Sequence, residues 1–398
     1  MPEETFFFTL LQGARIFSPQ ELGTQDLLLA GEKVAAIGQN LDFLPEKYCR
    51  RIDATGKWLV PGLIDGHIHL IGGGGEGGYH TRTPEVVLSD LTRAGITTVV
   101  GCLGTDGTMR HMSSLLAKVR ALEIEGLSAY LYTGAYEVPG PTLTGSVRSD
   151  LLFIDKVLGA GEVAISDHRS SQPTVTELLK LVAEARNGGL LSGKAGIVHC
   201  HIGDGHEALK PLFAIIKGGE IPITQLVPTH VNRNPYLLQE AFRWGRLGGV
   251  IDMTSGVYPS EGCWEALRAS QAIMRALAAK VPLDRITMSS DGNGSLPVFD
   301  EAGAPVSLAV ATPQTLWEEI RDLWQNEGLP LAMALAVATS NIAKVLKLWP
   351  QKGEIQVGSD ADFLVVTPDL TIEQVWARGQ QMIAQGEILQ RGTFENRG

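Results

Sequence analysis

Hydrophobic and polar residues alternate in short runs at both ends of the chain. Four such runs near the N-terminus are Phe8–Leu11, Ala14–Phe17, Asp26–Leu29 and Val34–Gly38. The same texture returns in residues 361–366, 372–376 and 381–388. Alternation with a period of two predicts strands with one buried face. We therefore expect residues 1–57 and 349–398 to form one small β-sandwich domain built from both chain ends.

Between residues 58 and 348 continuous apolar runs alternate with stretches of helical period. The eight apolar runs are 58–69, 96–102, 127–132, 163–166, 196–201, 225–230, 249–254 and 286–290. Helical stretches include 84–93, 111–125, 174–186 and 235–246. Strands alternating with helices predict a parallel sheet, and eight strands favour a closed (β/α)8 TIM-like barrel over an open sheet. The predicted fold class is α/β.

Polar residues gather where the predicted barrel strands end. His67 and His69 end the first run, Asp167, His168 and Arg169 the fourth, His199 and His201 the fifth, His230 the sixth and Asp291 the eighth. The chemistry of such barrels takes place at the C-terminal ends of the strands. This clustering indicates an active site in the barrel, whereas His80, His111 and His206 have no such context and are expected at the surface.

The motif His67-Ile68-His69 places two imidazoles on the same face of a strand. Two histidines at a strand end are often structural, but with His230 they indicate a site for a borderline divalent metal such as Zn²⁺. His199 and His201 share a strand face, and we favour His201 as a ligand because it is nearer the loop.

Two kinds of charged residue near these strand ends have alternative interpretations. Asp291 follows the eighth run and either caps a turn or acts as the general base beside a metal-activated water. Arg169 and Arg233 each lie just beyond a strand end. They are either solvated or hold substrate carboxylates by bidentate contacts.

Composition narrows the class of partner. The 398 residues carry a net charge of −11, which disfavours nucleic acid or an anionic membrane as a partner. The four cysteines, Cys49, Cys102, Cys200 and Cys263, show no C-x-x-C spacing, as expected of reduced thiols in a cytoplasmic protein. We expect neither a signal peptide nor a membrane span, and the G-x-G-x-x-G of a dinucleotide-binding fold is not found after the first strand.

These features together resemble the amidohydrolase superfamily, in particular its isoaspartyl dipeptidases. The similar motifs are Gly72–Glu76, Leu103–Asp106, Ala164–Arg169, Pro228–Asn234 and Ser289–Ser295. The resemblance implies a hydrolase that cleaves the isopeptide bond of β-aspartyl dipeptides with two Zn²⁺ per subunit and a metal-bridging hydroxide. Members of this family are often homo-oligomers, and the implied partner is a small-molecule substrate.

The resemblance also implies a role for individual residues. His67, His69 and Asp291 would hold one metal, and His201 and His230 the other. Asp291 would also be the general base, Tyr136 would polarise the carbonyl, Glu76 would bind the substrate's α-ammonium, Arg169 and Arg233 its carboxylates, and Gly74, Thr105 and Ser295 would complete the pocket.

One position departs from the family pattern. The family bridges its two metals with a carbamylated lysine, and the matching residue here is Glu162. A glutamate offers a bidentate carboxylate, but its carboxyl carbon lies three bonds nearer the backbone, a shortfall of roughly 3–4 Å. Either Glu162 bridges the metals, or it is only a strand-end carboxylate in an impaired, non-catalytic relative. A cyclic-amide hydrolase of the dihydroorotase or hydantoinase type is the other alternative.

Overall fold

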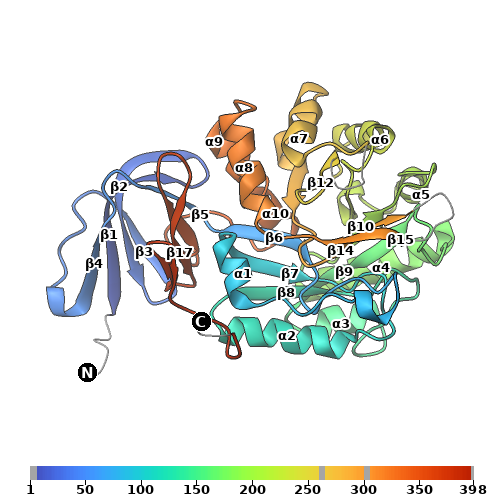
Figure 1. The fold of residues 1–398 in the computed structure, drawn as a ribbon, viewed down its shortest axis with the longest axis horizontal. Coiled ribbons are helices and arrows are strands. Elements are labelled where there is room, and N and C mark those ends of the chain that lie inside the picture. The colour runs from blue at the N-terminus through green and yellow to red at the C-terminus, as the bar shows by residue number, and fades with distance from the viewer. Residues whose placement is uncertain (1–6, 260–264, 300–304, 396–398) are drawn as a thin grey trace.

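The computed structural model describes residues 7–259, 265–299 and 305–395. Strands from both chain ends form a sheet at one end of the molecule, and the middle of the chain forms parallel strands with helices packed around them (Figure 1). This is the α/β class predicted from the alternation of strands and helices.

The terminal sheet has nine strands in the order β19-β18-β17-β16-β5-β1-β2-β3, with β4 paired to β1. Their bounds are β1 (Phe8–Phe17), β2 (Glu21–Ala30), β3 (Lys33–Gly38), β4 (Cys49–Asp53), β5 (Trp58–Pro61), β16 (Phe363–Val366), β17 (Ile372–Ala377), β18 (Gln380–Ala384) and β19 (Glu387–Ile388). The sheet bends back on itself, since Lys33 of β3 bridges Asp360 just ahead of β16. Leu11, Ile16, Leu59, Phe363 and Trp376 belong to the core enclosed in this way.

The barrel contains eight parallel strands. They are β6 (Leu63–Ile68), β7 (Ile96–Gly101), β8 (Ser128–Thr133), β9 (Val157–Ile165), β10 (Ile197–Ile202), β11 (Leu226–Thr229), β12 (Ile251–Thr254) and β13 (Ile286–Ser289). β6 to β11 form one continuous sheet, and β12 pairs with β13. The backbone N–H of His69 donates to Gly292 (2.9 Å) and that of Asp291 to His67 (3.1 Å), which joins the last strand to the first. The predicted barrel is therefore confirmed.

Helices cover the outside of the barrel. Their bounds are α1 (Leu88–Arg93), α2 (Met112–Ile124), α3 (Val147–Phe153), α4 (Val175–Ser192), α5 (Lys210–Ile216), α6 (Pro235–Arg246), α7 (Ala269–Ala278), α8 (Thr315–Gln325), α9 (Leu331–Ala336) and α10 (Ser340–Val345). A capping box between Thr174 and Glu177 begins α4, and the Asn234 side chain accepts from the Leu237 N–H to begin α6. After β13 the chain forms an antiparallel pair of strands, β14 (Ser295–Phe299) and β15 (Pro305–Val310). The sequence pattern did not predict this pair.

Two strand boundaries differ from the sequence-based expectation. The run 58–69 divides at Gly62, because the Gly62 N–H donates to Asp362 whereas that of Leu63 donates to Gly95. Residues 58–61 thus pair with the terminal sheet, and the barrel begins at Leu63. Glu162 lies inside β9 rather than before it, so its side chain projects from a barrel strand.

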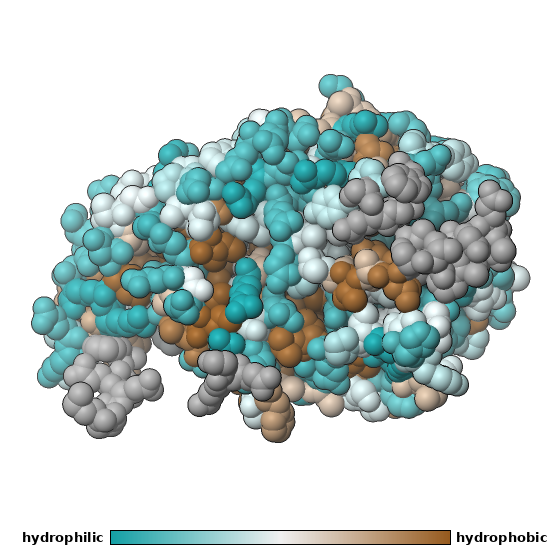
Figure 2. Space-filling model, viewed as in Figure 1, coloured by the Kyte–Doolittle hydropathy of each residue, from teal (hydrophilic) through white to brown (hydrophobic). Residues whose placement is uncertain are grey.

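The face seen in Figure 2 is largely hydrophilic, with hydrophobic residues in separate patches. Among the described residues, no helix is long and apolar enough to cross a bilayer. Cys49, Cys102 and Cys200 are buried free thiols, and Cys263 lies outside the described residues.

Candidate metal centre and substrate pocket

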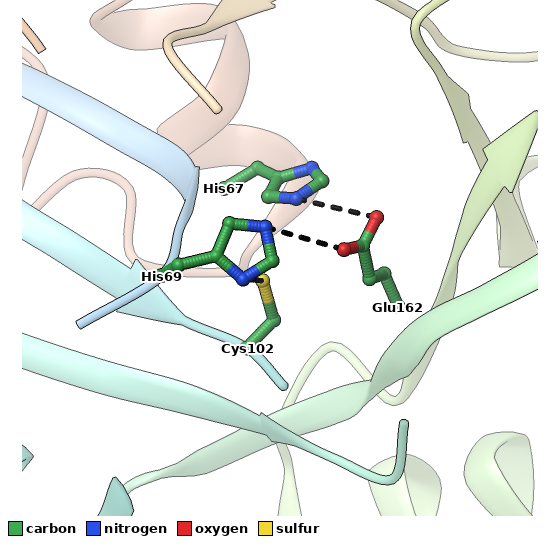
Figure 3. Close-up of side chains that lie close together, drawn as sticks. All are labelled: His67, His69, Cys102 and Glu162. Atoms are coloured by element: carbon green, nitrogen blue, oxygen red, sulfur yellow. Dashed lines mark hydrogen bonds and ion pairs between the residues drawn. The ribbon is translucent and has the colours of Figure 1, made fainter. Parts of the chain in front are cut away.

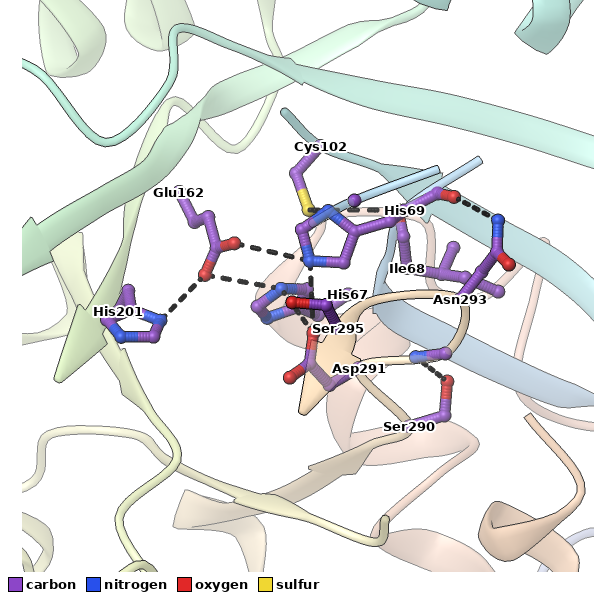
Figure 4. Close-up of polar contacts among 12 residues, drawn as sticks. His67, Ile68, His69, Cys102, Glu162, His201, Ser290, Asp291, Asn293 and Ser295 are labelled. Carbon is purple, nitrogen blue, oxygen red and sulfur yellow. Dashed lines mark hydrogen bonds and ion pairs between the residues drawn. The ribbon is translucent and has the colours of Figure 1, made fainter. Parts of the chain in front are cut away.

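The barrel brings the predicted ligands together at the C-terminal ends of its strands. His67 lies on β6, and His69 follows that strand by one residue. Glu162 and His201 lie on β9 and β10, and His230 and Asp291 come just after β11 and β13. Residues as far apart in the chain as His67 and Asp291, a separation of 224 positions, thereby meet in one cluster (Figure 4).

Glu162 occupies the centre of this cluster. Its Oε2 lies 3.3 Å from His67 Nε2, 3.2 Å from His201 Nδ1 and 3.6 Å from His230 Nε2. Its Oε1 lies 3.4 Å from His69 Nε2. The carboxylate therefore reaches histidines from both halves of the expected site, which is the arrangement that a bridging ligand needs.

Asp291 closes the cluster on the opposite side. Its Oδ1 lies 3.1 Å from His69 Nε2 and 3.4 Å from His67 Nε2. Burial opposes ionisation of Asp291, but His230, His69 and His67 outweigh it and hold the pKa of this carboxyl below its usual range. Asp291 is therefore a carboxylate.

The cluster fits divalent metal ions. His67 Nε2 and His230 Nε2 are buried and have no hydrogen-bond partner in the described part of the chain. Burial lowers the pKa of His230 to about 3, so this imidazole is in the neutral form that binds metal. Burial also opposes ionisation of Glu162, but the surrounding histidines outweigh it and lower its pKa well below the usual value. Buried imidazole nitrogens that face the carboxylates of Glu162 and Asp291 form a site suited to a cation.

His199 and His201 occupy different depths of the same strand. His201 faces Glu162, and the hydroxyl of Tyr136 lies 2.9 Å from its Nδ1. His199 lies deeper, with its Nε2 3.0 Å from His67 Nδ1 and its ring stacked on Tyr132. His199 therefore contacts His67 on the side away from Glu162 and orients that ring.

Cys102 joins the cluster although the sequence pattern did not single it out. It follows β7 directly, and its Sγ lies 4.0 Å from His69 Nδ1 (Figure 3). Isolated cysteines usually pack as small apolar residues, so nothing in its local sequence distinguishes it from Cys200.

A cavity of about 710 Å³ opens beside the cluster. His69, His201 and Asp291 line its floor, and it is large enough for a dipeptide. Its walls include Gly74, Glu76, Thr105, Tyr136, Arg169, Arg233 and Ser295. The pocket therefore contains each of the residues that the sequence motifs assigned to substrate.

Glu76 is held in a fixed position on the pocket wall. It accepts hydrogen bonds from Thr105 Oγ1 and Ser295 Oγ, each at 3.0 Å. Arg169 Nη1 lies 3.3 Å from its Oε1. Gly74 passes close to this group at φ +75°, and a Cβ there would lie 2.6 Å from the Thr81 carbonyl oxygen and 3.0 Å from Ser295 Cβ.

Asp167 links the pocket to the cluster, which the motif alone did not reveal. Its carboxylate accepts from Arg169 Nε (3.0 Å) and Nη2 (2.9 Å), and its Oδ2 lies 3.0 Å from His201 Nε2. Burial opposes its ionisation, but His201 and Arg169 outweigh burial and hold its pKa far below the usual range. Asp167 is thus a permanent anion that orients the guanidinium and one imidazole.

Arg233 and Tyr136 complete the pocket. Arg233 Nη1 lies 3.6 Å from Asp204 at the rim. Burial raises the pKa of Tyr136 well above its usual value, so its phenol stays protonated and acts as a donor.

Comparisons with known proteins agree with this geometry. The sequence profile of the amidohydrolase family matches residues 265–382. The β-aspartyl dipeptidase of Fervidobacterium islandicum AW-1, solved in complex with the β-Asp-Leu dipeptide, is 44% identical with a TM-score of 0.90, over 98% of this chain and 100% of that one. The L-hydantoinase of Paenarthrobacter aurescens is 22% identical over 92% of this chain and 86% of its own. The dihydropyrimidinase of Brevibacillus agri NCHU1002, at 15% identity, a TM-score of 0.68 and 97% of each chain, shares the fold.

The 44% identity is found over nearly the whole of both chains. The chain belongs to the β-aspartyl dipeptidases of the amidohydrolase family.

Proposed function

We propose that this protein is a zinc-dependent dipeptidase that hydrolyses the isopeptide bond of β-aspartyl dipeptides. The single observation that carries the proposal is the position of Glu76. Its carboxylate is fixed on the wall of the same cavity whose floor holds the histidine–carboxylate cluster. A substrate with a free ammonium group at a set distance from its scissile carbonyl fits that arrangement.

The recognition groups match the charges of such a dipeptide. A β-aspartyl dipeptide has one ammonium and two carboxylates, and the pocket offers Glu76 for the first and Arg169 and Arg233 for the others. Arg169 is held by Asp167 and Glu76, which leaves its planar guanidinium little freedom to lose on binding. Charge-assisted contacts of this kind fix the register of a small substrate.

Asp291 and Tyr136 would act on the scissile amide of the substrate. Divalent ions held by His67, His69, His201, His230, Glu162 and Asp291 would polarise the scissile carbonyl and lower the pKa of a water molecule. Asp291 would accept the proton of the attacking water and deliver it to the departing amine. The protonated phenol of Tyr136 would donate to the carbonyl oxygen as negative charge develops there.

Glu162 supports a two-metal site despite its short side chain. Its position within β9, rather than before it, brings the carboxylate to within 3.2–3.6 Å of nitrogens from four histidines. We therefore propose that Glu162 takes the place of the bridging carboxylate despite the shortfall expected from its side-chain length.

Two broader properties belong to the same proposal. We place the protein in the cytoplasm, in keeping with its dispersed cysteines and its negative charge. We also propose a homo-oligomer, on the family resemblance alone.

The test is hydrolysis of β-Asp-Leu, α-Asp-Leu, hydantoin and dihydroorotate by protein reconstituted with Zn²⁺. We expect cleavage of β-Asp-Leu only. Opening of either ring with no cleavage of β-Asp-Leu would favour a cyclic-amide hydrolase. Inactivity on all four with stoichiometric metal bound would indicate a non-catalytic relative.

A further inference from the structure

The Cys102 side chain is directed into the metal cluster. Its backbone N–H donates to the carbonyl oxygen of Ile68, the residue between His67 and His69, at 3.1 Å. This bond holds the start of the loop after β7 against the histidine motif. The residue is fully buried. Figure 3 shows the sulfur beside Nδ1 of His69, whose other ring nitrogen faces Glu162.

The four side chains form a compact donor set. Sγ of Cys102, one ring nitrogen each of His67 and His69, and one oxygen of Glu162 all lie within 4.8 Å of one another. Around a tetrahedral zinc ion, with Zn–N near 2.0–2.1 Å and Zn–S near 2.3 Å, donor atoms are about 3.5 Å apart. His67 Nε2 lies 3.3 Å from Oε2 of Glu162 and His69 Nε2 lies 3.4 Å from its Oε1, so each histidine already has that spacing from one of the two carboxylate oxygens. The cluster would need to contract by only about 1 Å to surround one ion.

The loop after Cys102 leaves room for this contraction. At Gly104 a Cβ would lie 2.9 Å from His69 Cε1 and 3.4 Å from Glu162 Oε1, so a larger residue would crowd the cluster. His67 Nε2 is buried, lacks a hydrogen-bond partner in the described chain, and faces the same space. A buried nitrogen without a hydrogen-bond partner is a donor available to a cation.

We propose that Cys102 is a metal ligand, binding through its thiolate the ion held by His67, His69 and Glu162. This inference rests on the metal dependence proposed above. Binding converts the thiol to a thiolate, with its proton released to solvent. The thiolate adds an anionic donor beside Glu162 and favours a borderline metal such as Zn²⁺ over Mg²⁺ or Mn²⁺.

A competing arrangement keeps Cys102 outside the coordination sphere. In it, His69 binds metal through Nε2 and donates its Nδ1–H to the sulfur, which is 4.0 Å away. In either arrangement, replacing Cys102 would weaken metal binding, since outer partners of ligating histidines contribute about 10- to 100-fold in affinity. Affinity alone therefore does not separate the two, whereas a direct metal–sulfur bond has its own absorption.

The experiment is cobalt substitution of the full-length protein. Metal is removed with a chelator, Co²⁺ is added under a phosphine reductant that contains no thiol, and the near-ultraviolet and visible spectra are recorded. Cys102→Ser is the test variant. Cys200→Ser is the matched control, because Cys200 is also buried, on β10, but it packs in the hydrophobic core and its Sγ donates to the Val198 carbonyl oxygen at 3.6 Å.

We expect an intense sulfur-to-cobalt charge-transfer band in the wild-type and Cys200→Ser proteins and its loss in Cys102→Ser. Visible cobalt bands without the charge-transfer band in the wild-type protein would overturn the role of Cys102 as a ligand, and the proposed metal site would stand. Failure to bind cobalt at all would overturn both this inference and the proposed metal dependence. Circular dichroism checks that Cys102→Ser is folded. If the variant is unfolded, the presence or absence of the charge-transfer band in the wild-type protein still decides whether a cysteine binds the metal.

Discussion

Replacing Glu76 by Gln tests whether this carboxylate recognises an ammonium group. The glutamine keeps the size of the side chain and can still pair with the Thr105 and Ser295 hydroxyls. Only 9% of the Glu76 side chain is exposed, so its contact with a substrate ammonium would be largely desolvated. A hydrogen bond to a charged group contributes about 1.5–3 kcal/mol. This corresponds to a loss of about 10- to 150-fold in kcat/KM.

The assay compares two substrates that differ only in that ammonium group. β-Asp-Leu has it, and succinyl-leucine lacks it while retaining the scissile amide and the leucine carboxylate. We expect the wild-type enzyme to prefer β-Asp-Leu by about 10- to 150-fold, and Glu76→Gln to reduce that preference to within about 3-fold. An equal loss of activity on both substrates would refute the reasoning, because Glu76 would then act by holding Arg169 in place.

Four further outcomes follow from the same structure. Removing metal with a chelator should lower kcat by about 1,000-fold, recovered on adding Zn²⁺, because Lewis-acid stabilisation contributes several kcal/mol; activity that survives complete removal, checked by elemental analysis, would contradict the proposed mechanism. Glu162→Gln should weaken binding of at least one ion by about 100-fold, measured by chelator competition. Tyr136→Phe should lower kcat by about 10²- to 10³-fold with little change in KM, as for other single oxyanion donors. Burial opposes protonation of Lys352, but Asp362 and Asp360 outweigh burial and raise the pKa of this lysine. The charged lysine therefore contributes its full stabilisation below the ordinary lysine pKa of about 10.4, and this stabilisation is lost as pH rises through the higher pKa of the folded state. Lys352→Met should cost about 3–5 kcal/mol in urea unfolding at neutral pH, because buried Asp362 loses its ion-pair partner while Asp360 keeps only Lys33. A cost below about 1 kcal/mol would show that water reaches Asp362.

The barrel and the position of its site could be predicted because both depend on local periodicity. Polar residues at the ends of apolar runs, such as His67, His201 and Asp291, identify the active face whatever the details of packing. The division of the first run at Gly62 could not be predicted, since residues 58–64 are apolar throughout. That division depends on which neighbouring strand accepts each backbone N–H.

The sequence by itself determined which donors are available: the spaced histidines, the carboxylates at strand ends, and a glutamate where the family has a carbamylated lysine. Tertiary structure alone decided how these donors are used. It separates His199 from His201 by depth within β10, brings the short side chain of Glu162 within reach of four histidines, and turns Cys102 toward His69. The physical reason is that a ligand set is defined by distances of a few ångströms between residues up to 224 positions apart, as are His67 and Asp291. Those distances arise only when eight strands close into a barrel and their ends converge.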